Sequence, residues 1–102
     1  MPKYVIAYLG GKQVANPQDR AAHMTRWKAW VDELGAAMVN PGTPLGPGKL
    51  VSSDGVSEHG PNRLTGFSIV LADNMEAALD IAKRCPFLEI GTIEVAEAME
   101  MR

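Results

Sequence analysis

Residues 64–85 read LTGFSIVLADNMEAALDIAKRC, and the patterns within them set the architecture of the chain. As far as Ala72, successive residues would point to alternate faces of a strand, and both faces are mostly apolar. This pattern predicts a strand that is buried on both faces. Asp73 then suits the N-cap of a helix, and Glu76 completes a capping box. Apolar residues recur at helical spacing as far as Cys85, and Pro86 ends the helix. The stretch therefore predicts one strand followed by one amphipathic helix.

The amino-terminal part of the chain repeats this form. Residues 3–9, KYVIAYL, are rich in β-branched and aromatic side chains and predict a strand. Asn16 suits the N-cap of a helix that runs to about Leu34, where Gly35 fits the C-terminal stop. Residues 36–40 predict a second strand. This part therefore also reads as strand, helix and strand.

Two further segments complete the order of elements. Residues 49–59 predict a polar hairpin, because Asp54-Gly55 at their centre is a strong turn signal. Residues 92–99 predict the last strand. The order is β-α-β-β-α-β, with the hairpin inserted between the second and third main strands. We therefore expect one ferredoxin-like split βαβ domain of the α+β class over residues 1–102.

The composition excludes several classes of protein. The formal net charge is -2, and no cluster of lysine and arginine suggests a nucleic-acid partner. No apolar run approaches the roughly 20 residues of a membrane span. The single cysteine, Cys85, cannot form a disulfide within the chain. We expect a cytoplasmic protein with no cofactor, no membrane and no nucleic acid among its partners.

The expected sheet is apolar on both faces. Two helices can cover only one face, and exposed apolar patches of several hundred Å² usually mark an interaction surface. A second copy of the same chain is the simplest cover. We therefore expect a homodimer.

His23 is the first candidate for chemistry. It lies in the middle of the apolar stripe of the first helix, flanked by Trp27 and Trp30. A neutral imidazole that faces a cavity can act as a general base. The alternative is a core histidine bonded to a backbone carbonyl. Trp27 and Trp30 could wall a site for an apolar ligand, or could simply be core residues.

Two tyrosines and one further histidine are weaker candidates. Tyr4 and Tyr8 share a face of the first strand, where their hydroxyls could bind a ligand or lie at a dimer interface. His59 lies beside Glu58 on the polar hairpin. A metal site needs more ligands fixed at close spacing, so we expect no metal.

Together, these segments resemble the YCII-related (DGPF) family over nearly the whole chain. The matching segments are Lys3 to Tyr8, His23, Leu34 to Ala37, Asn40 to Leu45, Asp54-Gly55, Leu64 to Ile69, Met75 to Ala78, Cys85 to Phe87 and Ile93 to Val95. The resemblance implies a ferredoxin-like domain that dimerises through its sheets as a dimeric α+β barrel, with a cleft near the first helix. It also implies that some members are small-molecule enzymes with a His-Asp pair, including a dehydrochlorinase of aromatic breakdown.

The chain departs from the family pattern at the acidic partner of the histidine. His23 matches the family histidine, but Cys85 stands where the usual Asp-Pro-Phe motif has its aspartate. Asp54 and Glu94 are the remaining candidates for a carboxylate partner. Two readings stay open. The chain is a small-molecule-binding or accessory dimer, or it is a lyase-type or hydrolase-type enzyme in which His23 acts as acid and base on a small cyclic substrate.

Overall fold

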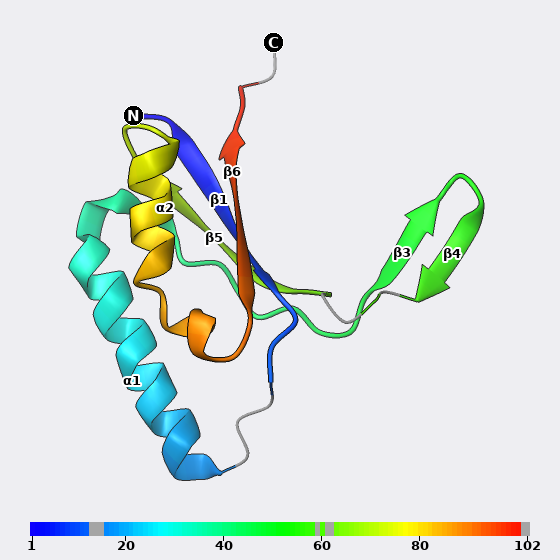
Figure 1. Ribbon diagram of the computed structural model, residues 1–102, viewed down its shortest axis with the longest axis horizontal. Coiled ribbons are helices and arrows are strands. Elements are labelled where there is room, and N and C mark those ends of the chain that lie inside the picture. The colour runs from blue at the N-terminus through cyan, green and yellow to red at the C-terminus, as the bar shows by residue number, and fades with distance from the viewer. Residues whose placement is uncertain (13–15, 59, 61–62, 101–102) are drawn as a thin grey trace.

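The computed structural model describes residues 1–12, 16–58, 60 and 63–100, and its elements follow the expected order (Figure 1). The elements are β1 (Lys3–Leu9), α1 (Pro17–Leu34), the 3-10 turn η1 (Gly35–Ala37), β2 (Met38–Asn40), β3 (Lys49–Ser52), β4 (Gly55–Glu58), β5 (Leu64–Leu71), α2 (Met75–Lys83), the 3-10 turn η2 (Pro86–Glu89) and β6 (Thr92–Ala98). None of the helices in these described ranges is long and apolar enough to cross a membrane.

Four strands form one sheet in the order β2-β5-β1-β6. Every neighbouring pair in this sheet is antiparallel. With one helix after β1 and one after β5, this is the ferredoxin-like arrangement, so the expected fold class is confirmed. The inserted hairpin is confirmed too, because β3 and β4 pair only with each other among the described strands.

The helix-covered face of the sheet holds the core. Tyr4, Ile6 and Tyr8 of β1 are buried there, in register with Val70, Ser68 and Gly66 of β5. The side chains between them point to the opposite face, since successive residues of a strand alternate. That open face carries residues that are only half-buried: Val5, Ala7, Leu9, Phe67, Ile69 and Leu71.

The first helix begins and ends as the sequence predicts. Asn16 accepts a hydrogen bond from the backbone N–H of Asp19 at 2.7 Å, and Gly35 takes a positive φ of 53° at the end. Most of the apolar stripe of this helix packs against the core, where Trp27, Val31 and Leu34 are partly buried. Among the residues of α1, only Trp30 is buried, and Met24 is 51% exposed. The reason is that the amino-terminal part of the stripe borders a cavity instead of the core.

Two local boundaries differ from the sequence prediction. Asn74, not Asp73, caps α2, because its backbone is extended and its side chain accepts a hydrogen bond from the N–H of Ala77 at 2.9 Å. Ala36 and Ala37 continue helix α1 as a 3-10 turn, so β2 is shorter than expected. The Met38 N–H donates to the Gly35 oxygen, which closes this turn and delays the strand to Met38.

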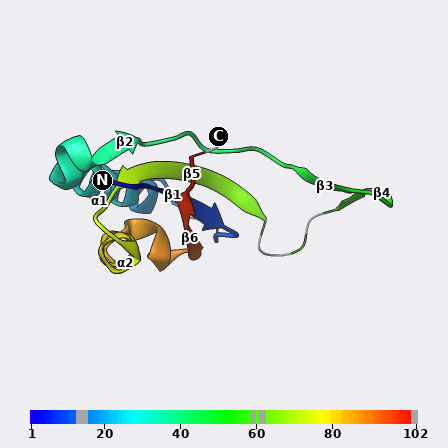
Figure 2. The same ribbon diagram turned by 90° about the horizontal axis from the view of Figure 1, so that it is seen from above.

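The hairpin, residues 49–58, is hereafter called the arm. It extends away from the layer of helices and strands (Figures 1 and 2). Val51 and Val56 lie opposite each other on its two strands and are 80% and 66% exposed. Two-stranded hairpins are marginally stable alone in water, so burial of this exposed apolar pair would stabilise the arm.

Candidate functional site

A cavity of about 290 Å³ lies where α1 passes the edge of the sheet. Helix α1 contributes one wall, and residues 41–44, which lead from β2 towards the arm, contribute another. The cavity is lined by Tyr8, His23, Met24, Trp27, Pro41, Gly42, Thr43, Pro44, Thr65, Gly66, Phe67 and Phe87. The structure thus brings three of the candidate site residues, Tyr8, His23 and Trp27, together at one place.

Aromatic rings form much of the cavity wall. The Tyr8 ring lies edge-on to Trp27, with centroids 5.4 Å apart, and tilted against Phe87 at 5.0 Å. The Phe87 ring can take this position only because Gly91 has no side chain, since a Cβ on Gly91 would lie 2.4 Å from Phe87 Cε2. The rings therefore form a packed, preorganised apolar wall.

His23 supplies an unusual polar atom. Its Nδ1 is buried and has no hydrogen-bond partner among the described residues. A buried polar atom without a partner costs about 1–3 kcal/mol, so such atoms are rare outside functional sites. Of the described residues that line the cavity, none is Lys, Arg, Asp or Glu. No carboxylate of this lining therefore pairs with the imidazole.

The Tyr8 hydroxyl is already engaged and is not free for a ligand. It lies 2.7 Å from the Ser68 hydroxyl, and the Ser68 hydroxyl donates to the backbone oxygen of Pro41 at 2.8 Å. The thiol of Cys85 lies close to the Tyr8 hydroxyl. Burial raises the pKa of Tyr8 well above its ordinary value. Tyr8 therefore offers the cavity its ring and not an acid or a base.

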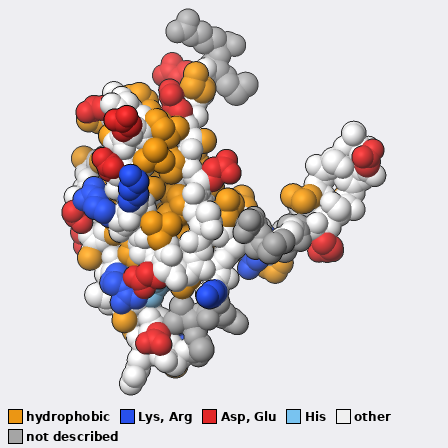
Figure 3. Space-filling model, viewed as in Figure 1, with side chains coloured by type: hydrophobic (Ala, Val, Ile, Leu, Met, Phe, Trp, Pro, Cys, Tyr) orange, Lys and Arg blue, Asp and Glu red, His pale blue; other side chains and the backbone are white. Residues whose placement is uncertain are grey.

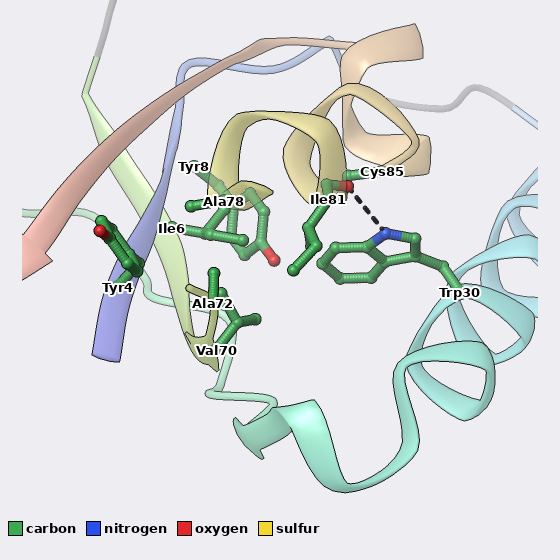
Figure 4. Close-up of a cluster of buried hydrophobic side chains, with 9 residues drawn as sticks. All are labelled: Tyr4, Ile6, Tyr8, Trp30, Val70, Ala72, Ala78, Ile81 and Cys85. Carbon is green, nitrogen blue, oxygen red and sulfur yellow. Dashed lines mark hydrogen bonds between the residues drawn. The ribbon is translucent and has the colours of Figure 1, made fainter. Parts of the chain in front are cut away.

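Four other candidates lie away from the cavity. Trp30 is a core residue whose indole N–H donates to the backbone oxygen of Ile81 at 3.2 Å, and Tyr4 lies at the far side of the same cluster (Figure 4). Asp54 lies in the turn of the arm. Glu94 is paired with Ala7 on the open face, opposite to the face that bears Tyr8. His59 lies outside the described residues.

The sequence reasoning missed the wall made by residues 41–44 and the role of Phe87. Pro44 bridges to Gly66 across the end of β5, which brings this loop over the cavity. Gly42 has a φ of +77°, and a Cβ on it would lie 1.6 Å from the Phe67 oxygen, so a glycine is required. The Pro-Gly-Thr-Pro sequence signalled a rigid loop, but nothing in it indicated which element it would face.

A second, larger hollow of about 530 Å³ lies between α1, α2 and η2. Four of the five charged side chains in its described lining pair with each other, and the fifth, Lys83, lies 3.9 Å from Asp80. Arg26 binds both carboxylate oxygens of Glu89, at 2.9 and 2.7 Å, and Arg84 lies 2.9 Å from Glu33. Basic and acidic side chains are likewise interspersed over the helices in Figure 3. The smaller cavity, with its aromatic wall and unpaired imidazole nitrogen, is therefore the candidate site.

The comparisons with known proteins agree with the fold. A family model described as the YCII-related domain matches residues 3–102. A solved structure of 5-chloro-2-hydroxyhydroquinone dehydrochlorinase from Burkholderia phenoliruptrix, in complex with 2,5-dihydroxybenzoquinone, superposes with a TM-score of 0.61. It is 16% identical and covers 97% of this chain and 95% of its own. A comparison with curated proteins finds no match. The chain belongs to the YCII-related domain family.

The buried thiol of Cys85 should make the stability of the protein depend on pH. Burial raises the pKa of Cys85 from 9.0 to about 11, against smaller opposing contributions from the Phe87 backbone and the Tyr8 hydroxyl. Because the folded protein holds this proton more tightly than the unfolded chain, the stabilisation is complete below pH 9 and is lost as the pH rises to about 11. Urea unfolding across this window should show a falling free energy of unfolding. In Cys85→Ala the free energy of unfolding should decrease less over this pH range. An equal decrease in both proteins would contradict the raised pKa of Cys85.

Proposed function

We propose that this YCII-related protein binds a small, uncharged, planar ring compound in the cavity beside His23, as a small-molecule-binding or accessory protein. One observation carries the proposal: His23, whose buried Nδ1 has no partner among the described residues, lines an aromatic cavity whose described lining holds no Lys, Arg, Asp or Glu. Ligand sites are typically apolar concavities with a few placed polar groups. The volume of about 290 Å³ is at the lower end of the usual range of roughly 300–1,000 Å³. A compound of one or two rings fits this space.

The rings of the wall favour a flat ligand. Trp27, Tyr8 and Phe87 are in mutual contact and are held by the core, so they offer fixed faces and edges. Aromatic pairs gain about 0.5–1.5 kcal/mol beyond area burial when a ring meets another ring edge-on or offset. A planar ligand gains these contacts without reorganising the protein.

The chemistry of the lining favours a ligand without charge. A buried charge that lacks a partner is strongly unfavourable. The polar side chains of the described lining are His23, Thr43, Thr65 and the engaged Tyr8. The Thr65 hydroxyl already donates to the Tyr8 backbone oxygen at 3.1 Å, so His23 and Thr43 are the side chains that can exchange hydrogen bonds with a hydroxyl or a carbonyl of the ligand. A phenol or a cyclic ketone therefore suits the cavity better than a carboxylic acid.

An enzyme is the second candidate function. The structural neighbour is named for removing chloride from a hydroxylated ring and holds a quinone. In this chain His23 would act as acid and base on such a small cyclic compound. The absence of a carboxylate from the described lining, with Cys85 in the place of the family aspartate, favours binding over catalysis.

We further propose a homodimer in the cytoplasm. The half-buried apolar open face and the exposed valines of the arm lie on one chain, so a symmetric pair can cover both with the same contacts. The single cysteine is a free, buried thiol, as is common inside cells.

Calorimetric titration with phenol and benzoate tests the binding proposal. We expect phenol to bind and benzoate to bind at least about tenfold more weakly, because its charge would lack a partner. His23→Ala should weaken phenol binding about two- to tenfold through one lost hydrogen bond. Trp27→Leu should also weaken it.

Trp30→Phe is the matched control for the tryptophan variant. It should lower the free energy of unfolding by about 1–3 kcal/mol through lost packing and one lost hydrogen bond. Because Trp30 contacts Trp27 without lining the cavity, the variant should weaken phenol binding less than Trp27→Leu does. Benzoate binding as tightly as phenol, or affinity unchanged in both His23→Ala and Trp27→Leu, would contradict the proposed site.

Sedimentation velocity tests the proposed dimer. The wild-type protein should sediment as a dimer at micromolar concentration. Val51→Lys should weaken the dimer, because a charge would replace an apolar contact of the arm. Asp32→Lys, an exposed change on α1, adds the same side chain away from the arm and should leave the dimer intact. A wild-type monomer would refute the proposal.

A further inference from the structure

We infer that Ser68 is the positioning residue of the cavity, because its one hydroxyl joins the Tyr8 ring at the floor to Pro41 in the opposing wall. The inference rests on the proposed function of the same cavity. Ser68 is fully buried, at 0% exposure, on the helix-covered face of β5. Its oxygen lies 2.7 Å from the Tyr8 hydroxyl and 2.8 Å from the Pro41 backbone oxygen. Tyr8 and Pro41 both line the cavity.

The directions of these two bonds follow from the atoms present. The Pro41 backbone oxygen can only accept, so the single Ser68 proton points to it. The Tyr8 hydroxyl must then donate its proton to the Ser68 oxygen. The hydroxyl of Ser68 therefore has a single arrangement that satisfies both neighbours. Hydroxyls arranged in this way fix the position of each group that they join.

The surroundings of Ser68 show that the hydroxyl is not needed for packing. Its neighbours Ile6, directly opposite on β1, and Val70, two residues along β5, are both 0% exposed. A polar group in such a dry place is unfavourable unless it is hydrogen-bonded. Alanine at this position would avoid the free-energy cost of burying a hydroxyl. The serine is explained by the two bonds that it makes across the cavity.

The wall at residues 41–44 depends on this contact at one end. Its far end is attached to β5 by the Pro44–Gly66 bridge and by the Leu45 N–H, which donates to the Thr65 oxygen at 2.9 Å. Near its start, the Pro41 oxygen accepts from Ser68. The Gly42 N–H also donates to Asn40 Oδ1 at 2.8 Å, and Asn40 pairs with Ile69 of β5. Loss of the Ser68 hydroxyl therefore removes the one side-chain bond that the described residues make between β5 and the start of the wall, together with the bond to the Tyr8 hydroxyl, and loosens the wall relative to the floor.

The experiment compares Ser68→Ala with two other variants. Tyr8→Phe removes the floor bond and keeps the wall bond. Val70→Ala is the matched control, because it creates a defect in the same strand and the same core but does not touch the lining. Calorimetry with phenol gives the affinity, and hydrogen exchange of a peptide covering residues 41–45 reports the wall without any ligand.

We expect Ser68→Ala to lose about tenfold in phenol affinity, the effect of one to two hydrogen bonds, and to exchange faster in residues 41–45. Tyr8→Phe should lose less affinity and leave the exchange of the wall near wild type. Val70→Ala should be less stable but keep both the affinity and the slow exchange. Should Ser68→Ala fail to fold, Ser68→Cys, which donates only weakly, is measured in the same two assays.

The outcomes separate this inference from the proposed function. Wild-type affinity together with wild-type exchange in Ser68→Ala overturns the positioning role, whereas His23→Ala and Trp27→Leu can still support the site. If wild-type protein binds no phenol, the proposed ligand class fails, and the exchange of residues 41–45 still decides the role of Ser68. If Ser68→Ala and Val70→Ala lost phenol affinity equally, general destabilisation would explain the loss, and this result would also overturn the inference.

Discussion

The Tyr8 side chain connects the parts of the molecule on which the candidate site depends. Its ring contacts Trp27 of α1 and Phe87 of η2, and its hydroxyl reaches Ser68 of β5 and the thiol of Cys85. A tyrosine can do this because it has an apolar body and one polar end, so it can be buried once the hydroxyl has partners. The same ring is therefore part of the core on one side and the floor of the cavity on the other. The geometry of the cavity is thus tied to the packing of the sheet.

Much of the fold could be predicted from short-range patterns. The capping by Asn16 and the stop at Gly35 each depend on neighbours in the chain, and the structure has both. The turn predicted at Asp54-Gly55 is displaced by one residue to Ser53-Asp54, because Gly55 already pairs with Ser52 in the hairpin. The cap at Asn74 was missed because Asp73 is an equally good candidate in sequence. A one-residue difference of this kind is decided by the backbone entering the helix.

The site was less predictable because its walls come from segments far apart in the chain. Trp27 and Trp30 fall in the same helical stripe, yet one lines the cavity and the other donates to Ile81 in the core. Hydrophobic periodicity shows which face of a helix is apolar, but it does not show whether a given residue on that face packs in the core or lines a cavity. The loop at residues 41–44 and Phe87 reach the cavity only through long-range contacts. His23 could be singled out because a polar residue in an apolar stripe is visible in the sequence itself.

A ring compound that binds in the cavity beside His23 would change the surroundings of the Trp27 indole. The two indole N–H signals in a ¹H–¹⁵N spectrum, recorded while phenol is added, test this proposal. Trp27 lines the cavity, whereas Trp30 lines the other hollow and its N–H is bonded to the Ile81 oxygen, so we expect a large, saturable shift of the Trp27 signal and a smaller change for Trp30. Saturable shifts confined to the hollow around Arg26 and Glu89, with the Trp27 signal unmoved, would contradict it.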